Sequence, residues 1–165
     1  MTTITSRVRI HASKDEVWKI LADLGSIQNF HPGVRKSYYS TDVKQGLGAA
    51  RVCELLPIGK VEERVIDWKD GEELTLDVVP LEKVPPLRDA SGRIQLEVDG
   101  DETVVTMTVS YRLGFGPIGT LMDALFIRLQ FKKVVPAVLR GLKRHAETGE
   151  VLQGAERKWV QAATA

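Results

Sequence analysis

The chain begins with a regular alternation of apolar and polar positions. Over Thr2–Ile10 the isoleucine and valine side chains fall on one face, and most of the threonine and arginine side chains fall on the other. A period of two predicts a strand with one buried face. Ser13 and Glu16 then have the S-x-x-E spacing of a capping box, which predicts a short helix ending near Gly25. Residues 26–30 add one further turn, so two short helices should follow the first strand.

Six further runs rich in Val, Ile, Thr and Tyr predict strands, and turn signals separate them. The runs are Val34–Thr41, Gly48–Leu55, Lys60–Trp68, Leu74–Val79, Arg93–Val98 and Thr103–Leu113. The longest separator is the stretch from Pro80 to Gly92, which we expect to be a turn region. Because consecutive strands with hairpin-length links favour antiparallel neighbours, the pattern indicates an antiparallel meander.

The spacing of apolar residues changes after Gly116-Pro117. From Ile118 to Thr148 they recur at helical intervals, which predicts one long amphipathic helix that Gly149 terminates. Pro136 lies inside it and predicts a kink near Lys132. The elements together make an α+β fold, with a single long helix covering one face of a seven-stranded sheet. One helix cannot fill the whole concave side, so we expect a cavity between helix and sheet.

Composition bounds the class of protein. The chain has 165 residues, 43% of them hydrophobic, which is enough for one domain with a sizeable core. We expect residues 1–150 to form a single ligand-binding domain and residues 151–165 to be a C-terminal tail. Twenty-three basic residues against 22 acidic ones give a net charge of +1, so we expect no nucleic-acid partner.

The chain offers little for binding a metal or cofactor. The single cysteine, Cys53, excludes an internal disulfide and a cysteine-rich metal site. His11, His31 and His145 lie far apart in the sequence, without ligand partners at metal spacing. Gly114–Gly119 has the G-x-G-x-x-G spacing, but no second parallel strand follows the helix, so we reject a dinucleotide site and expect no cofactor. No apolar leader segment precedes the first strand, and we expect a cytoplasmic protein.

Several short motifs follow one another along the chain. They are Ala12-Ser13-x-x-x-Val17-Trp18, Phe30-His31-Pro32-Gly33-Val34 with Ser37, Gly46-x-Gly48-x-x-Arg51, Gly59-x-Val61-x-Glu63-Arg64-Val65, Pro117-x-Gly119, and Leu142-Lys143 with Glu147. In this order they resemble the START-like (SRPBCC) superfamily, in particular its polyketide cyclase/dehydrase and lipid-transport branch. The resemblance spans residues 3 to 150 and is shared by plant pollen-allergen and pathogenesis-related proteins.

The resemblance implies a helix-grip fold, in which a seven-stranded antiparallel curved sheet wraps around a long C-terminal helix. It also implies a ligand pocket between sheet and helix. It does not imply one reaction, because members carry lipids, bind hormones, cyclise polyketides or act as chaperones.

Arg51 and Glu63 are the candidate catalytic pair. Alternation places Arg51 on the face of Cys53, and Glu63 on the face of Val61 and Val65. If those faces point inward, the two opposite charges share an apolar cavity, where each needs a partner. In an enzymatic interpretation Arg51 holds an oxyanion or enolate and Glu63 shuttles a proton. In the alternative interpretation the two residues form a structural ion pair, or they lie on the outer face after a bulge.

The resemblance adds one comparison for this pair. Related plant enzymes that rearrange sulfenic acids are similar in using an arginine and a glutamate on matching strands. Many such relatives also carry a tyrosine in the segment that corresponds to Arg88-Asp89-Ala90, where this chain has Ala90.

The other candidate ligand-binding residues form the expected pocket wall. We expect the wall to include Leu76, Val78, Met107, Val109, Leu121, Leu125 and Leu129. Tyr111 could offer its hydroxyl to a ligand, or pack in the core. His31 lies in a loop that we expect at the pocket mouth, where its ring meets either a ligand or solvent. Cys53 is a further candidate ligand-binding residue, expected as a small buried hydrophobe and not as a nucleophile.

The last predicted helix is basic on its polar side. Its cations are Arg128, Lys132, Lys133, Arg140, Lys143 and Arg144. The plain interpretation is a solvated outer face, with the terminal charges suited to the helix dipole. The alternative is a surface that meets an anionic membrane or partner, although we expect no membrane contact.

Three functional hypotheses follow. The first is a binder or carrier of a small hydrophobic molecule, such as a polyketide, lipid or aromatic metabolite, in an internal pocket. The second is a cofactor-independent cyclase, dehydratase or isomerase that uses Arg51 and Glu63 in the same pocket. The third is a protein-interaction module that uses the basic last helix.

Overall fold

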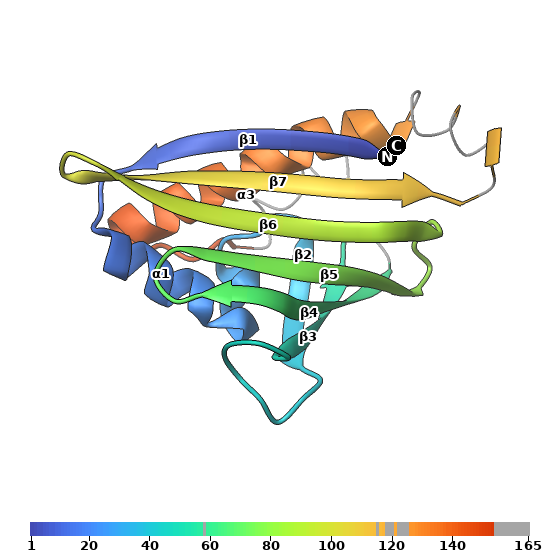
Figure 1. Cartoon of the computed structure of the whole chain (residues 1–165), viewed down its shortest axis with the longest axis horizontal. Helices are drawn as coiled ribbons and strands as arrows, with labels where there is room; N and C mark the ends of the chain where they lie inside the picture. The colour runs from blue at the N-terminus through green and yellow to red at the C-terminus, as the bar shows by residue number, and fades with distance from the viewer. Residues whose placement is uncertain (58, 115, 118–120, 122–125, 154–165) are drawn as a thin grey trace.

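The structure is a computed structural model that describes residues 1–57, 59–114, 116–117, 121 and 126–153 (Figure 1). Within these residues the chain forms one seven-stranded antiparallel sheet and a long C-terminal helix. The elements are β1 (Thr2–Ile10), α1 (Lys14–Ala22), η1 (Leu24–Asn29), β2 (Val34–Tyr39), β3 (Ala50–Leu55), β4 (Lys60–Lys69), β5 (Glu73–Glu82), β6 (Leu87–Asp99), β7 (Glu102–Leu113) and α3 (Arg128–Thr148). The expected α+β helix-grip fold is confirmed.

The strand order shows how the chain returns to its first strand. Strand β1 pairs with β7, and the remaining strands follow as β7-β6-β5-β4-β3-β2. After β1 the chain therefore crosses to the far edge of the sheet by way of α1 and η1, and then comes back one strand at a time. The helix α3 packs along β1 behind the sheet, with α1 at one end of the molecule (Figure 1).

The first helix forms as its sequence predicts. The Ser13 side chain accepts a hydrogen bond from the Glu16 N–H, and the Glu16 carboxylate accepts one from the Ser13 N–H at 2.9 Å. These two bonds satisfy backbone donors that a helix start leaves without partners. The buried side of α1 then faces the sheet and α3.

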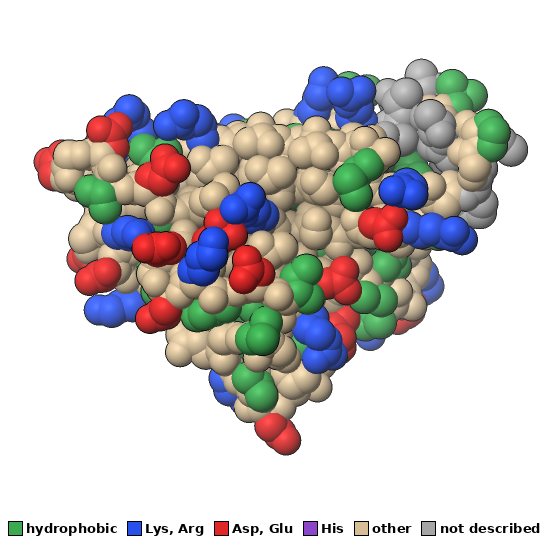
Figure 2. Space-filling view, viewed as in Figure 1, with side chains coloured by type: hydrophobic (Ala, Val, Ile, Leu, Met, Phe, Trp, Pro, Cys, Tyr) green, Lys and Arg blue, Asp and Glu red, His purple; other side chains and the backbone are tan. Residues whose placement is uncertain are grey.

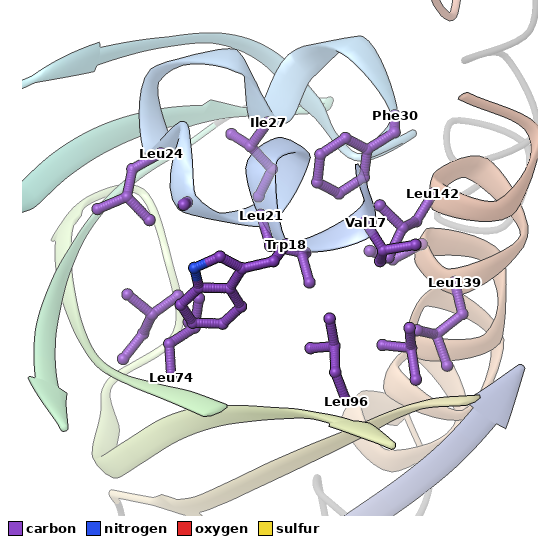
Figure 3. Packing of buried hydrophobic residues seen from close by; sticks show 14 of the residues in the cluster. Val17, Trp18, Leu21, Leu24, Ile27, Phe30, Leu74, Leu96, Leu139 and Leu142 are labelled. Carbon is purple, nitrogen blue, oxygen red and sulfur yellow. The ribbon is translucent and has the colours of Figure 1, made fainter. Parts of the chain in front are cut away.

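The hydrophobic core brings together side chains from all layers (Figure 3). Its labelled members are Val17, Trp18 and Leu21 of α1, Leu24 and Ile27 of η1, Phe30, Leu74 of β5, Leu96 of β6, and Leu139 and Leu142 of α3. The short helices thus fill one end of the space between sheet and α3.

The end of α3 matches the sequence prediction. Gly149 has a φ of 72°, and its N–H donates to the His145 carbonyl at 2.9 Å. Glycine adopts this left-handed conformation at little cost, which makes it a common helix terminator. The predicted start near Ile118 falls where residues 118–120 and 122–125 lie outside the described part of the chain. Pro136 lies inside α3, and the kink near Lys132 stays a prediction.

The turn region expected from Pro80 to Gly92 is wrong for most of its length. Strand β5 continues to Glu82 and β6 already begins at Leu87, so the connection is short. Pro80 sits opposite Val61 beside a register shift in the β4–β5 pairing. A proline, which has no N–H, is tolerated where the hydrogen-bond ladder is already interrupted.

Candidate functional site

A cavity of about 380 Å³ lies between the sheet and α3. Its wall is built from α1, η1, the inner faces of β3–β7 and one side of α3. The volume falls within the range typical of small-molecule sites, and most of the side chains that line it are apolar. The fold therefore leaves room for a ligand where the single long helix does not fill the concave side of the sheet.

Alternating positions of the central strands form most of the wall. The contributing residues are Leu74, Leu76 and Val78 of β5, Ala90, Gly92 and Ile94 of β6, and Met107, Val109 and Tyr111 of β7. A spacing of two places each set on the same face of its strand. Among the residues expected on this wall, Leu76, Val78, Met107 and Val109 lie there, and so does Tyr111, which is fully buried against Phe131.

Gly92 is a wall residue that the sequence pattern did not predict. It is buried in β6 opposite Leu76 and Val109, yet a Cβ built on it would meet no atom within 4 Å. Since both neighbours line the cavity, the missing side chain leaves open space. The only sequence signal was a glycine inside a polar stretch, which indicated the end of a turn rather than the wall of a pocket.

Leu121 and Leu129 do not lie on the wall, and these two expectations are corrected. They are 62% and 53% exposed, respectively, and the cavity is lined elsewhere on the helix. The described positions of the last helix that line it are Ile127, Gln130, Phe131, Val134, Val135 and Val138. This stripe has helical spacing but a different rotation from the expected one, so Leu129 points away. Leu125 lies outside the described residues.

Arg51 and Glu63 come together as the polar end of the cavity. They are direct cross-strand partners in β3 and β4, and Arg51 Nε donates to Glu63 Oε2 at 2.7 Å. Arg51 Nη1 donates to the Leu24 carbonyl at 2.8 Å, which joins the pair to η1. The Arg51 side chain is 5% exposed and that of Glu63 is 19% exposed, and both line the cavity.

The two charges stabilise each other. Burial by itself lowers the pKa of Arg51, but the adjacent Glu63 carboxylate reverses this and raises it above the ordinary value. Burial alone would likewise raise the pKa of Glu63, yet the charge and hydrogen bond of Arg51 hold that pKa below its usual range. Both groups therefore stay ionised at neutral pH.

Cys53 lies beside this pair rather than on the cavity wall. It is 1% exposed, and its Sγ donates to Glu63 Oε2 at 3.4 Å. Burial raises the pKa of the Cys53 thiol, and the negative charge of Glu63 raises it further. The thiol therefore stays protonated, which suits a hydrogen-bond donor and not a nucleophile.

His31 lines the cavity near Glu63. Its Nδ1 accepts a hydrogen bond from the Gly33 N–H at 3.0 Å, so the neutral ring carries its proton on Nε2. The charge of a protonated His31 contributes to the lowered pKa of Glu63. Asp23, which accepts from the Tyr39 hydroxyl at 3.2 Å, also lines the cavity.

The cations of α3 divide into two groups. Lys143 donates to Glu147 and to the Arg9 carbonyl, both at 2.7 Å, and Arg144 pairs with Glu150. The others are exposed and make no ion pair within the described part of the chain; they are Arg128, Lys132, Lys133 and Arg140. On the opposite side of the molecule, the outer face of the sheet carries acidic and basic side chains interspersed (Figure 2).

The described residues contain neither a metal-binding cluster nor a membrane-spanning helix. No group of three or more His, Cys, Asp or Glu side chains there is arranged to hold a metal ion. No helix within the same ranges is both long enough and apolar enough to cross a membrane.

The fold and the cavity define a class of protein, the helix-grip domain, in which a curved antiparallel sheet and a long C-terminal helix surround a mainly apolar space. The particular family follows from a family model described as polyketide cyclase / dehydrase and lipid transport, which matches residues 1–147. The chain belongs to this family, and the superfamily resemblance carried by the motifs is confirmed. Family and fold indicate a hydrophobic ligand-binding or cyclase/dehydrase-type domain.

Solved structures from distant organisms share the fold. The protein XoxI from Bacillus cereus superimposes with a TM-score of 0.68 at 16% identity, covering 87% of this chain and 94% of its own. Ginseng major latex-like protein 151 from Panax ginseng gives a TM-score of 0.67 at 11% identity, covering 88% of this chain and 97% of its own. No curated protein matches the chain in sequence. At these identities the likeness shows the fold alone.

Proposed function

We propose that this protein binds and carries a small, mainly apolar molecule in the cavity between the sheet and α3. The observation that carries the proposal is a cavity of about 380 Å³ whose wall is mainly apolar, with a charged pair at one end. Transfer of apolar surface from water to such a wall is favourable by about 25 cal/mol per Å². Because the family description joins polyketide cyclisation with lipid transport, the ligand classes to test are polyketides, lipids and aromatic metabolites.

The state of the charged pair favours a carrier over a proton-transfer enzyme. A general base works best when its pKa lies near the working pH. The pKa of Glu63 is lowered and that of Arg51 is raised, so neither group readily exchanges a proton near neutral pH. A cyclase or isomerase in this cavity would have to use the pair mainly to stabilise charge. The interaction-module alternative depends on the exposed cations of α3 alone.

The first experiment looks for the ligand that the protein already holds. Native mass spectrometry of the purified full chain should show a bound mass that organic extraction releases and identifies. A bound species with an apolar skeleton is the expected result, because the cavity wall offers mainly apolar contacts.

A second experiment places the ligand in the cavity. N-phenylnaphthylamine, an uncharged fluorescent probe, should bind to the protein saturably, and Gly92→Leu should weaken that binding at least about tenfold by filling the open space. Glu97→Leu adds the same side chain at an exposed position of β6 and should leave binding unchanged. A protein that shows neither a co-purifying molecule nor saturable probe binding would overturn the proposal.

A further inference from the structure

The charged groups of the cavity wall restrict the head group that it can hold. Among the described lining residues, the side chains with a carboxyl, imidazole or guanidinium group are Asp23, His31, Arg51 and Glu63. Arg51 and Glu63 neutralise each other through their 2.7 Å hydrogen bond, and Asp23 adds a further carboxylate at an exposed position. Even with a protonated His31, these four side chains have no net positive charge to offer an anion.

Each member of the ion pair nevertheless has a polar atom that can still form a hydrogen bond. Glu63 Oε2 accepts from Arg51 and Cys53, while Glu63 Oε1 has no hydrogen-bond partner among the described residues. Arg51 uses Nε and Nη1, and its Nη2 likewise makes no hydrogen bond within the described part of the chain. Every fully buried side-chain nitrogen or oxygen of that part has a partner. Glu63 Oε1 and Arg51 Nη2 are therefore accessible, on two side chains that line the cavity.

We propose that the ligand carries an uncharged hydroxyl head group, an alcohol or a phenol, that donates to Glu63 Oε1 and accepts from Arg51 Nη2. The inference rests on the proposed function and names the class of ligand for the same cavity. A hydroxyl is the smallest group that both donates and accepts a hydrogen bond. It thus matches one open acceptor and one open donor on adjacent side chains.

Charged head groups fit this end of the cavity poorly. A carboxylate would face the Glu63 and Asp23 charges, and an ammonium group would face Arg51. Either would also lose its hydration on entering an apolar space, and the charges of Arg51 and Glu63 are already paired with each other, so they do not offset that loss. The remaining carboxylate, Asp23, is exposed and stays hydrated. An ether or alkane meets the opposite difficulty, because it leaves Glu63 Oε1 desolvated without a donor.

The test compares ligands that differ only at the head group. Decanol, decyl methyl ether, decanoate and decylamine are titrated near neutral pH against the full-length protein loaded with N-phenylnaphthylamine. Decanol should displace the probe at a concentration about tenfold below that of the ether and of both charged compounds. Apolarity alone would favour the ether over the alcohol, so the expected order reports the hydrogen bond. Equal or tighter binding of the ether, the carboxylate or the amine would overturn the inference.

A charge variant provides a second measurement. Glu63→Gln leaves Arg51 without its counter-charge, so decanoate should gain about tenfold relative to decanol. Glu62→Gln is the matched control, since Glu62 lies on the neighbouring position of β4 and pairs with Arg64. An unchanged preference in folded Glu63→Gln would contradict the inference. If that variant does not fold, the comparison of alcohol and ether with the wild-type protein decides by itself.

The two proposals fail in different ways. If neither the probe nor any decyl compound binds, the carrier function is wrong. If the probe binds and decanol is not the preferred decyl compound, the carrier function stands and the hydroxyl head group is wrong.

Discussion

Arg51 illustrates how a single charged residue is kept inside a mainly apolar region. An unpaired guanidinium there would cost several kcal/mol, and so would an unpaired Glu63 carboxylate. The structure gives Arg51 two oxygen acceptors, one from Glu63 and one from the Leu24 carbonyl. The second acceptor fixes η1 against β3, so the pair also positions the short helices that close this end of the cavity.

A double-mutant cycle measures how strongly the buried charges of Arg51 and Glu63 depend on each other. Glu63→Leu or Arg51→Met alone should destabilise the protein by about 3–5 kcal/mol, because each leaves a buried charge without its partner. The double variant should be more stable than either single variant, since it removes both charges together. Denaturant unfolding of the four proteins gives the coupling free energy.

The surface pair Arg64–Glu62 on the same strand provides the control for this cycle. Their side chains are 44% and 24% exposed, and Glu62→Gln should change stability by less than about 1 kcal/mol. Single variants at Arg51 and Glu63 that are as stable as this control would show that the buried charges do not depend on each other.

At the scale of elements, the position of α3 depends on one close contact. A Cβ at Gly141 would lie 2.0 Å from the Phe30 carbonyl oxygen and 3.1 Å from its carbonyl carbon. Only glycine lets the helix approach the backbone after η1 this closely. Glycine in the middle of a helix normally costs about 1 kcal/mol relative to alanine, so Gly141 serves packing here and not helix stability.

Gly141→Ala should therefore destabilise the protein in spite of the better helix former. We expect a net loss of about 1–3 kcal/mol from overpacking against backbone, measured by denaturant unfolding. Gly92→Ala is the control, because a Cβ there meets no atom within 4 Å and should leave stability unchanged or slightly raised. Equal stability of the two alanine variants would show that α3 moves away from Phe30 without cost.

Several elements could be predicted from local sequence, and others could not. The capping box at Ser13 and the αL glycine at Gly149 depend on residues a few positions apart, and both are confirmed. The β5 and β6 ends around Pro80 could not be predicted, because the register shift beside the proline arises only when β5 pairs with β4. The face of α3 was predicted wrongly at Leu129, because apolar residues occur on more than one side of that helix.

At the scale of the whole molecule, we expect the free energy of unfolding to decrease as the pH is lowered. The pKa of Glu63 is lowered by Arg51, and those of Glu16, Glu73 and Glu147 are lowered by hydrogen bonds that they accept. A carboxyl whose pKa is lower in the folded state binds more protons when unfolded. Its stabilising effect is complete above the unfolded pKa, about 4.3, and is lost as the pH falls through the folded pKa.

Unfolding free energies measured from neutral pH down through the acid range should thus decrease below about pH 5. The Arg51→Met/Glu63→Leu double variant should lose less stability over the same range, because the buried carboxylate is gone. An identical acid decline in wild type and double variant would assign the effect to the other carboxylates.

The sequence by itself determined the order of most elements and the antiparallel character of the sheet, while the meeting of Arg51 and Glu63 was one of two alternatives until the structure placed them opposite each other. The element order and the antiparallel character follow from periodicity and from neighbouring strands, which are local properties of the chain. The tertiary structure decided which side of α3 faces the sheet, the open space at Gly92 and the bond from Arg51 to the Leu24 carbonyl. Each of these depends on how elements that are far apart in the sequence pack against each other. Hydrophobic periodicity does not determine the rotation of a helix about its axis or the distance between two elements.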